Sequence, residues 1–183
     1  MANGFSLALS HVGYLVTDMN KMVDFYTRVM KFVVSDRGDR EQNGAIVFKT
    51  RNPAEHHQLV FATGRPTDLT FSIVQQISFR VDSLETLREM YHAVQKEPIQ
   101  KMLGPVTHGN ALSVYFLDPE GNRVELLIDT PWHVSQPCGM KVDLSLSDEA
   151  LWAWLEARAR ERPGFKPRAE WEQEMRGRLA AVQ

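Results

Sequence analysis

The sequence predicts an α+β protein made of two tandem units, each a strand, a helix and three strands, followed by a helical C-terminal extension. Its 183 residues, 43% of them hydrophobic and 24% charged, can bury one substantial core or two small fused ones. Two further observations support two units: a faint internal repeat, and Pro and Gly residues that break the periodic pattern after residue 130.

The repeat aligns segment 11–19 (HVGYLVTDM) with segment 76–84 (QISFRVDSL), an offset of 65 residues (76 − 11). Apolar residues coincide at alternate positions, as in strands, and then at helical spacing further along both segments. Each half is therefore expected to open with a strand and a helix. Chance similarity between two amphipathic strand and helix pairs is the alternative.

Short extended segments follow the helix in each half. In the first half the expected strands cover 31–35, 44–50 and 57–63, with loops at 36–42 and 51–54. In the second half the expected strands cover 99–102, 111–117 and 123–129.

These elements predict a first module at 6–65, a second module at 72–130 and a C-terminal helical extension at 131–183. In the extension, Ser147 is expected to cap a helix over 148–162, and a second helix is expected over 169–181. We expect the extension to be a packing or dimer element.

The stretch LDPEGN at 117–122 suits a type I turn followed by a left-handed glycine. Closing the hairpin on Asp118 and Asn122 places Tyr115 opposite Glu125, within about 5.5 Å at Cβ. A carboxylate flanked by apolar strand residues is costly to bury unpaired, so Glu125 requires a cation that Lys and Arg do not supply on its immediate face. The alternative is that Glu125 points outward.

His11 and Gln76 occupy equivalent places in the repeat, and pairing of the two units brings their first strands together. With Glu125 they would give one imidazole, one amide oxygen and one carboxylate, which leaves coordination positions open for substrate or water. The predicted fold is therefore a cup-shaped mixed sheet around one divalent metal.

Two adjacent histidines begin the stretch HHQLVF at 56–61. Histidine serves as a metal ligand, as a proton shuttle or as polar filler. Because the two side chains have opposite strand parity, only one can face the predicted site, and two solvent-facing histidines are the alternative.

Three stretches, HVGYLVTDMNKMVDFY, HHQLVF and YFLDPEGNRVELL, together with the repeated unit, resemble the vicinal oxygen chelate superfamily over residues 6–130. This superfamily includes glyoxalase I, fosfomycin-resistance enzymes and type I extradiol ring-cleavage dioxygenases. The double histidine and the Tyr ten residues before the Glu are most similar to the extradiol enzymes.

The resemblance implies a role for each matching residue. It makes His11 and Glu125 metal ligands and His57 the acid–base histidine. It also places Tyr115 beside the substrate and makes His108 similar to a further histidine near the site, although its spacing to Tyr115 is shorter than in that family.

Gln76 stands where the ring-cleavage enzymes have their second histidine ligand, and an amide oxygen is a weaker donor for Fe(II). Three possibilities stay open: a weakened or differently metallated dioxygenase, a non-oxidative metal lyase or isomerase, and a binding protein without chemistry. A glyoxalase-like isomerase would need a carboxylate base on the last strand of the first unit, where Gln58 and Val60 supply none.

The favoured expectation is an extradiol-dioxygenase-like metalloenzyme that cleaves a small catechol-type diol with O2. Fe(II) is the expected metal, with Mn(II) or another divalent ion possible. A net charge of −2 without a long basic run argues against nucleic acid or membrane partners. The lone Cys138 and the lack of a long apolar run favour a cytoplasmic protein, and a homodimer is expected.

Overall fold

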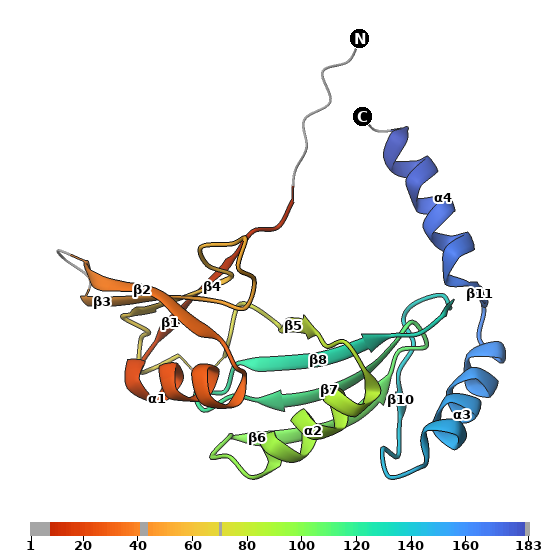
Figure 1. The fold of residues 1–183 in the computed structure, drawn as a ribbon, viewed down its shortest axis with the longest axis horizontal. Helices are drawn as coiled ribbons and strands as arrows, with labels where there is room; N and C mark the ends of the chain where they lie inside the picture. The colour runs from red at the N-terminus through yellow and green to blue at the C-terminus, as the bar shows by residue number, and fades with distance from the viewer. Residues whose placement is uncertain (1–7, 41–43, 70, 182–183) are drawn as a thin grey trace.

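The chain folds into two mixed β-sheets with helices packed against them (Figure 1). This computed structural model describes residues 8–40, 44–69 and 71–181. Within them each half of the chain contains a strand, a helix and three strands, in that order. The predicted α+β class with two repeated units is therefore confirmed.

The first sheet has the strand order β1-β4-β3-β2, with β1 parallel to β4. Its elements are β1 (Val12–Val16), α1 (Met19–Asp24), the π-helical turn η1 (Phe25–Val29), β2 (Val33–Arg40), β3 (Gly44–Thr50) and β4 (Leu59–Thr63). A parallel pair needs a long crossover connection, which here runs through the helix and two antiparallel strands.

The second sheet repeats this order as β5-β8-β7-β6, with β5 parallel to β8 and a short strand β10 added beside β6. Its elements are β5 (Ile77–Arg80), α2 (Leu84–Gln95), β6 (Lys101–Thr107), β7 (Ala111–Leu117), β8 (Arg123–Asp129) and β10 (Met140–Lys141). The helix caps match too: Asp18 and Ser83, 65 residues apart, each accept a hydrogen bond from the backbone N–H three residues on.

Aromatic and polar contacts hold the two halves together. The rings of Phe25 and Phe116 lie 6.1 Å apart, and the carboxylate of Glu120 accepts hydrogen bonds from the backbone N–H groups of Thr17 and Asp18. Arg65 also reaches this carboxylate. The β7–β8 hairpin is thereby fixed against the start of α1, which sets the relative position of the two sheets.

Three strand boundaries differ from the prediction. β2 runs to Arg40, whereas the sequence predicted a loop from residue 36, because backbone pairing with β3 needs no apolar alternation; residues 41 and 42 of that predicted loop lie outside the described part. β6 extends to Thr107 through a bulge at Gly104, which has a φ of 97° and disguised the strand. β4 begins at Leu59, so His57 precedes the strand.

The C-terminal extension contains β9 (Trp132–His133), α3 (Asp148–Arg160), β11 (Lys166–Pro167) and α4 (Arg168–Ala180). Helix α3 buries Leu151, Leu155 and Ala159 against the core, which fits the expected packing element. Helix α4 has no buried residue and extends away from the sheets (Figure 1). None of the helices in the described ranges is long and apolar enough to cross a bilayer.

The division into modules at 6–65 and 72–130 and an extension at 131–183 stays a prediction, with residues 6 and 7 outside the described part.

Candidate functional site

Glu125 lies at the centre of a polar cluster built from three neighbouring strands. Tyr115 on β7 and Ser78 on β5 stand directly opposite Glu125 on β8, as the hairpin register predicted for Tyr115. Tyr115 donates to one carboxylate oxygen at 2.5 Å, and Gln76 Nε2 donates to the other at 2.7 Å. Ser78 donates to that second oxygen as well.

The carboxylate of Glu125 is buried, with 5% of the residue exposed, and all three of its hydrogen-bond donors are neutral. In the part of the chain that the structure describes, no Lys or Arg pairs with it; Arg80, next along the same face of β5, pairs with Asp129 instead. A buried carboxylate without a cation is costly, so this position suits a bound positive ion. Carboxylate, amide and imidazole groups fit a divalent metal such as Mn(II) or Fe(II).

His108 extends this cluster away from Glu125. Its Nε2 lies 2.8 Å from the Tyr115 hydroxyl, and its Nδ1 lies 2.6 Å from the carbonyl oxygen of Cys138. A carbonyl only accepts, so Nδ1 carries a proton.

The phenol of Tyr115 stays protonated at neutral pH. Burial, and then the hydrogen bond to Glu125, raises its pKa to about 12. Glu125, Tyr115 and His108 therefore form a hydrogen-bonded path along which a proton can move without free ionisation of the phenol.

A second group of titratable side chains lies at the start of the first sheet. The rings of His11 and His57 are 4.3 Å apart, and the Nδ1 atoms of His56 and His57 are 2.8 Å apart. Partial desolvation, and then the charges of His11 and His56, lowers the pKa of His57 below its usual 6.5. His57 is therefore a neutral imidazole at pH 7 and can accept a proton.

The structure thus brings the predicted residues together in two groups. Gln76, Tyr115 and His108 join Glu125, and His11 lies beside His57. Within the described ranges no hydrogen bond or ring contact links the two groups, and no three His, Cys, Asp or Glu side chains are placed to share one ion. The shared three-ligand site of His11, Gln76 and Glu125 stays a prediction.

Ser78 is the member of the cluster that the sequence analysis missed. It follows Gln76 by two residues and therefore lies on the same face of β5. The repeat places it at the position of Gly13, which has no side chain, so only the parallel pairing of β5 with β8 reveals its contact with Glu125.

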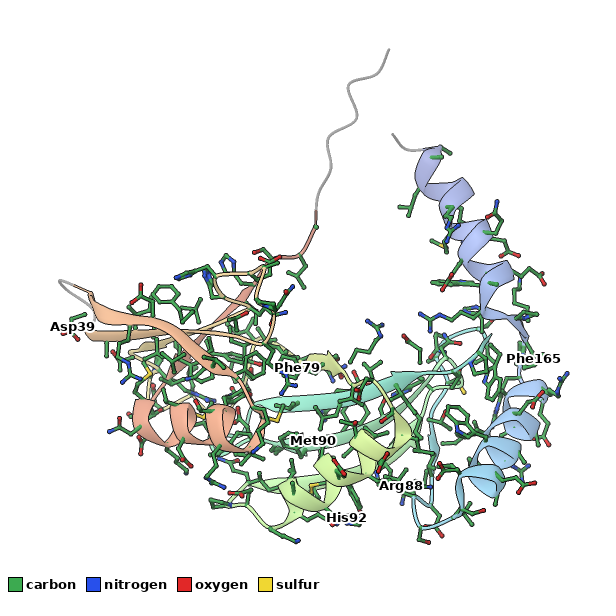
Figure 2. All side chains as sticks on the ribbon, in the orientation of Figure 1. Asp39, Phe79, Arg88, Met90, His92 and Phe165 are labelled. Atoms are coloured by element: carbon green, nitrogen blue, oxygen red, sulfur yellow. The ribbon has the colours of Figure 1, made fainter. Side chains whose placement is uncertain are left out.

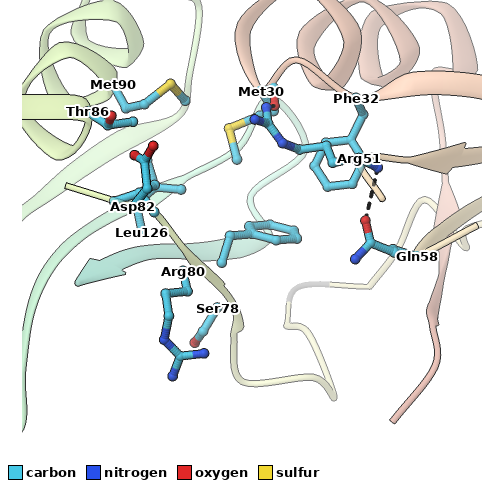
Figure 3. A pocket seen from close by; sticks show the side chains of 12 residues that line it. Met30, Phe32, Arg51, Gln58, Ser78, Arg80, Asp82, Thr86, Met90 and Leu126 are labelled. Atoms are coloured by element: carbon cyan, nitrogen blue, oxygen red, sulfur yellow. Dashed lines mark hydrogen bonds between the residues drawn. The ribbon is translucent and has the colours of Figure 1, made fainter. Parts of the chain in front are cut away.

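A cavity of about 550 Å³ lies at the junction of the two halves, where Phe79 and Met90 of the second half lie beside the first half (Figure 2, Figure 3). Its wall includes Gln58, the neighbour of His57 in the chain, and Ser78, the partner of Glu125. A cavity of this size can hold a small organic molecule.

Known proteins with similar folds agree with this architecture. A structure of the fosfomycin resistance protein FosX from Listeria monocytogenes, complexed with Mn(II) and sulfate, is 19% identical with a TM-score of 0.52 and covers 71% of this chain and 95% of that chain. A glyoxylase/bleomycin resistance protein/dioxygenase domain from Frankia sp. is 19% identical with a TM-score of 0.59 and covers 69% of this chain and all of that one. At such identities the likeness shows the fold alone.

Sequence comparison identifies the family. A relative, biphenyl-2,3-diol 1,2-dioxygenase 2 of Rhodococcus globerulus, is 27% identical over 160 residues that cover 78% of this chain and 80% of that protein. A family model matches residues 8–126, more than half of the sequence. The resemblance to the vicinal oxygen chelate proteins is thereby confirmed, and the chain belongs to the Glyoxalase/Bleomycin resistance protein/Dioxygenase superfamily.

Proposed function

We propose that this chain is an extradiol-dioxygenase-like metalloenzyme that cleaves a small catechol-type diol with O2. One divalent metal, Fe(II) or Mn(II), would be held by His11, Gln76 and Glu125. The observation that carries the proposal is the buried carboxylate of Glu125, which has neutral donors and no cation among the described residues. The similarity to a biphenyl-diol dioxygenase supports the substrate class.

A bound metal would lower the pKa of the diol hydroxyls and hold the diol and O2 side by side. The remaining roles fall to this chain's own side chains. Tyr115, protonated at neutral pH, donates to an oxygen of the bound diol, and its contact with His108 lets a proton leave or return along the path.

His57 is the proposed base on the other side of the substrate. Because its pKa is lowered, the His57 imidazole is neutral at pH 7. The ring can therefore take a proton from the diol hydroxyl and return it later in the reaction. The proposal places a homodimer in the cytoplasm and assigns no membrane or nucleic-acid partner.

A second function, binding of a small molecule without metal or chemistry, is favoured by one observation. Gln76, Ser78 and Tyr115 already supply three hydrogen bonds to Glu125. In this alternative those donors compensate the carboxylate, and no ion is needed.

Metal content of anaerobically purified protein distinguishes the two functions. We expect about one iron or manganese ion per chain in the wild type and its loss in Glu125→Ala and Glu125→Gln, because Glu125 is the one anionic ligand of the proposed set. Glu89→Ala, which removes an exposed carboxylate from α2, is the matched control and should retain the metal.

Oxygen consumption with catechol then tests turnover in the metal-loaded protein. Loss of both metal and oxygen consumption in the Glu125 variants alone would support the dioxygenase. Absence of metal from the wild type, even after supplementation, would refute it and support metal-free binding.

A further inference from the structure

The cavity at the junction of the two halves is separate from the Glu125 cluster. Leu126 on β8 and Phe79, its partner on β5, both contribute to the cavity wall. Side chains alternate between the two faces of a sheet, so the carboxylate of Glu125 lies on the other face. A diol and a metal held at Glu125 would therefore leave this cavity free for a ligand of its own.

The cavity follows the free edge of β5. Five consecutive residues, 78–82, line it, although their side chains alternate between the faces of the sheet. β5 is the outermost strand of its sheet and has β8 on one side only. The N–H of Val81 donates to Leu127, so alternate residues of β5 bond to β8 and the backbone groups of Ser78 and Arg80 point away from it. Among the described residues these outward N–H and C=O groups have no hydrogen-bond partner.

Apolar side chains from both halves form a second part of the cavity wall. Met30 and Phe32 come from the first half, and Phe79 and Met90 come from the second. The rings of Phe32 and Phe79 lie 5.5 Å apart at an interplanar angle of 67°. Edge-to-face rings and thioether groups favour contact with a further aromatic ring.

Two side chains of opposite charge line the cavity without meeting each other. Figure 3 shows Asp82, from the second half, and Arg51, from the first half, on opposite sides of it. A hydrogen bond from Thr86 is the main cause that lowers the pKa of Asp82, so this carboxyl is ionised at neutral pH. The Nη1 of Arg51 donates to the carbonyl oxygen of Met30 at 2.6 Å, and its Nε and Nη2 have no partner in the described part of the chain.

The third charged residue of the wall is already engaged. Arg80 contacts Asp129 through both Nε and Nη2. The groups left for a ligand are therefore one carboxylate, one guanidinium, the free backbone edge of β5 and the apolar side chains. A matching ligand carries a cation and an anion close together, and an apolar ring.

We infer that this cavity binds a free α-amino acid with an aromatic side chain. Asp82 and the outward carbonyl of Arg80 accept hydrogen bonds from its ammonium group, and Arg51 donates to its carboxylate. The ring packs against the phenylalanine and methionine side chains. A cavity of about 550 Å³ is large enough for such a molecule. The inference does not rest on the proposed metal or diol.

Calorimetric binding of three probes to the full, metal-free chain tests this inference. The probes are L-phenylalanine, 3-phenylpropanoate, which lacks the ammonium group, and 2-phenylethylamine, which lacks the carboxylate. We expect L-phenylalanine to bind about tenfold more tightly than either of the others, because each of these loses one charge-assisted contact. No binding of L-phenylalanine, or equal binding of all three probes, would overturn the inference.

Two variants assign the charged groups of the ligand to their partners. Asp82→Asn should weaken L-phenylalanine binding about tenfold and leave 3-phenylpropanoate binding unchanged. Arg51→Gln should weaken both of these ligands and leave 2-phenylethylamine binding unchanged, which also shows that the cavity is intact. Arg51→Lys should retain part of the affinity, because the charge remains without the parallel N–H groups.

Glu85→Gln and Lys31→Gln are the matched controls. Both side chains are exposed, lie close in the chain to residues of the cavity wall and do not line the cavity. L-phenylalanine should bind to both variants as it does to the wild type. An equal loss of affinity in the controls would show a general charge effect and overturn the roles of Asp82 and Arg51.

Repeating the L-phenylalanine titration with Mn(II) separates this inference from the proposed function. We expect the same affinity with and without the metal, because the cavity and Glu125 lie on opposite faces of the second sheet. Binding that requires Mn(II) would place the ligand at Glu125 and overturn the inference. Binding that ignores Mn(II) and depends on Asp82 and Arg51 supports it, whether or not catechol is turned over.

Discussion

The two halves of the molecule place different residues at one equivalent junction of three strands. In the second half Tyr115, Glu125 and Ser78 stand side by side on β7, β8 and β5. In the first half the same places on β3, β4 and β1 hold Phe48, Val60 and Gly13. One junction is therefore a hydrogen-bonded cluster, and the other contains no polar side chain.

This difference shows which candidate site residues are held rigidly by the sheet and which are free to move. Glu125 is buried, and two of its three hydrogen bonds come from the strand residues Tyr115 and Ser78, whose backbone pairing holds the side chains in place. The first half contributes His11 and His56, both exposed, from segments outside its strands. We infer that the buried side chains of the second half position a ligand and that the exposed histidines of the first half adjust their positions to contact it.

The largest expected effect comes from changing Gln76, the weakest of the three proposed metal ligands. Gln76→His should raise the affinity for Mn(II) or Fe(II) about tenfold to a hundredfold, because an imidazole nitrogen is a better donor than an amide oxygen. Titration calorimetry of the metal-free protein measures the dissociation constant.

Gln75→His serves as its control, since Gln75 is exposed and its side chain has the opposite strand parity. If both variants bind metal like the wild type, residue 76 is not a ligand, and the proposed metal site would have to be built from other groups.

The repeat predicted most of the fold, because strand and helix periodicity is local. The 65-residue offset located β1 with β5 and α1 with α2, and the turn at Asp118 set the register of Tyr115 against Glu125. The end of β2 and most of β6 escaped prediction because polar residues and a Gly-Pro pair conceal strands held by backbone hydrogen bonds.

The site was predictable only in part. The pairing of Gln76 with Glu125 depends on the parallel contact of β5 and β8, which the repeat implies but no single segment encodes. The ion pairs of Asp129 were not predictable either, because Arg80, Asp129 and Arg168 come from three distant segments and their pairing is decided by tertiary packing.

A smaller effect is expected for the polar junction itself. Tyr115→Phe removes the hydroxyl between His108 and Glu125 and should lower the free energy of unfolding by about 1–2 kcal/mol, since both partners lose a hydrogen bond. Urea denaturation at pH 7 measures it. Tyr91→Phe, on α2, is the control, because its hydroxyl has no hydrogen bond within the described ranges. Equal free energies of unfolding for the two variants would mean that the hydrogen bonds of the Tyr115 hydroxyl contribute no more to stability than an exposed hydroxyl does.

The smallest effect concerns the looser group in the first half. In metal-free protein His11→Asn should raise the pKa of His57 toward 6.5, because one of the charges that lowers it is removed while desolvation, the larger cause, remains. A lowered pKa in the folded state means that the unfolded chain binds the proton more tightly. The stability that His57 contributes is therefore present above pH 6.5 and is lost as the pH falls through the folded pKa.

The pH titration of the His57 ring protons by NMR measures the shift, with Ser10→Ala as control. An unchanged His57 titration would show that the two imidazoles are too mobile to interact, and His11 would then be free to turn toward Glu125.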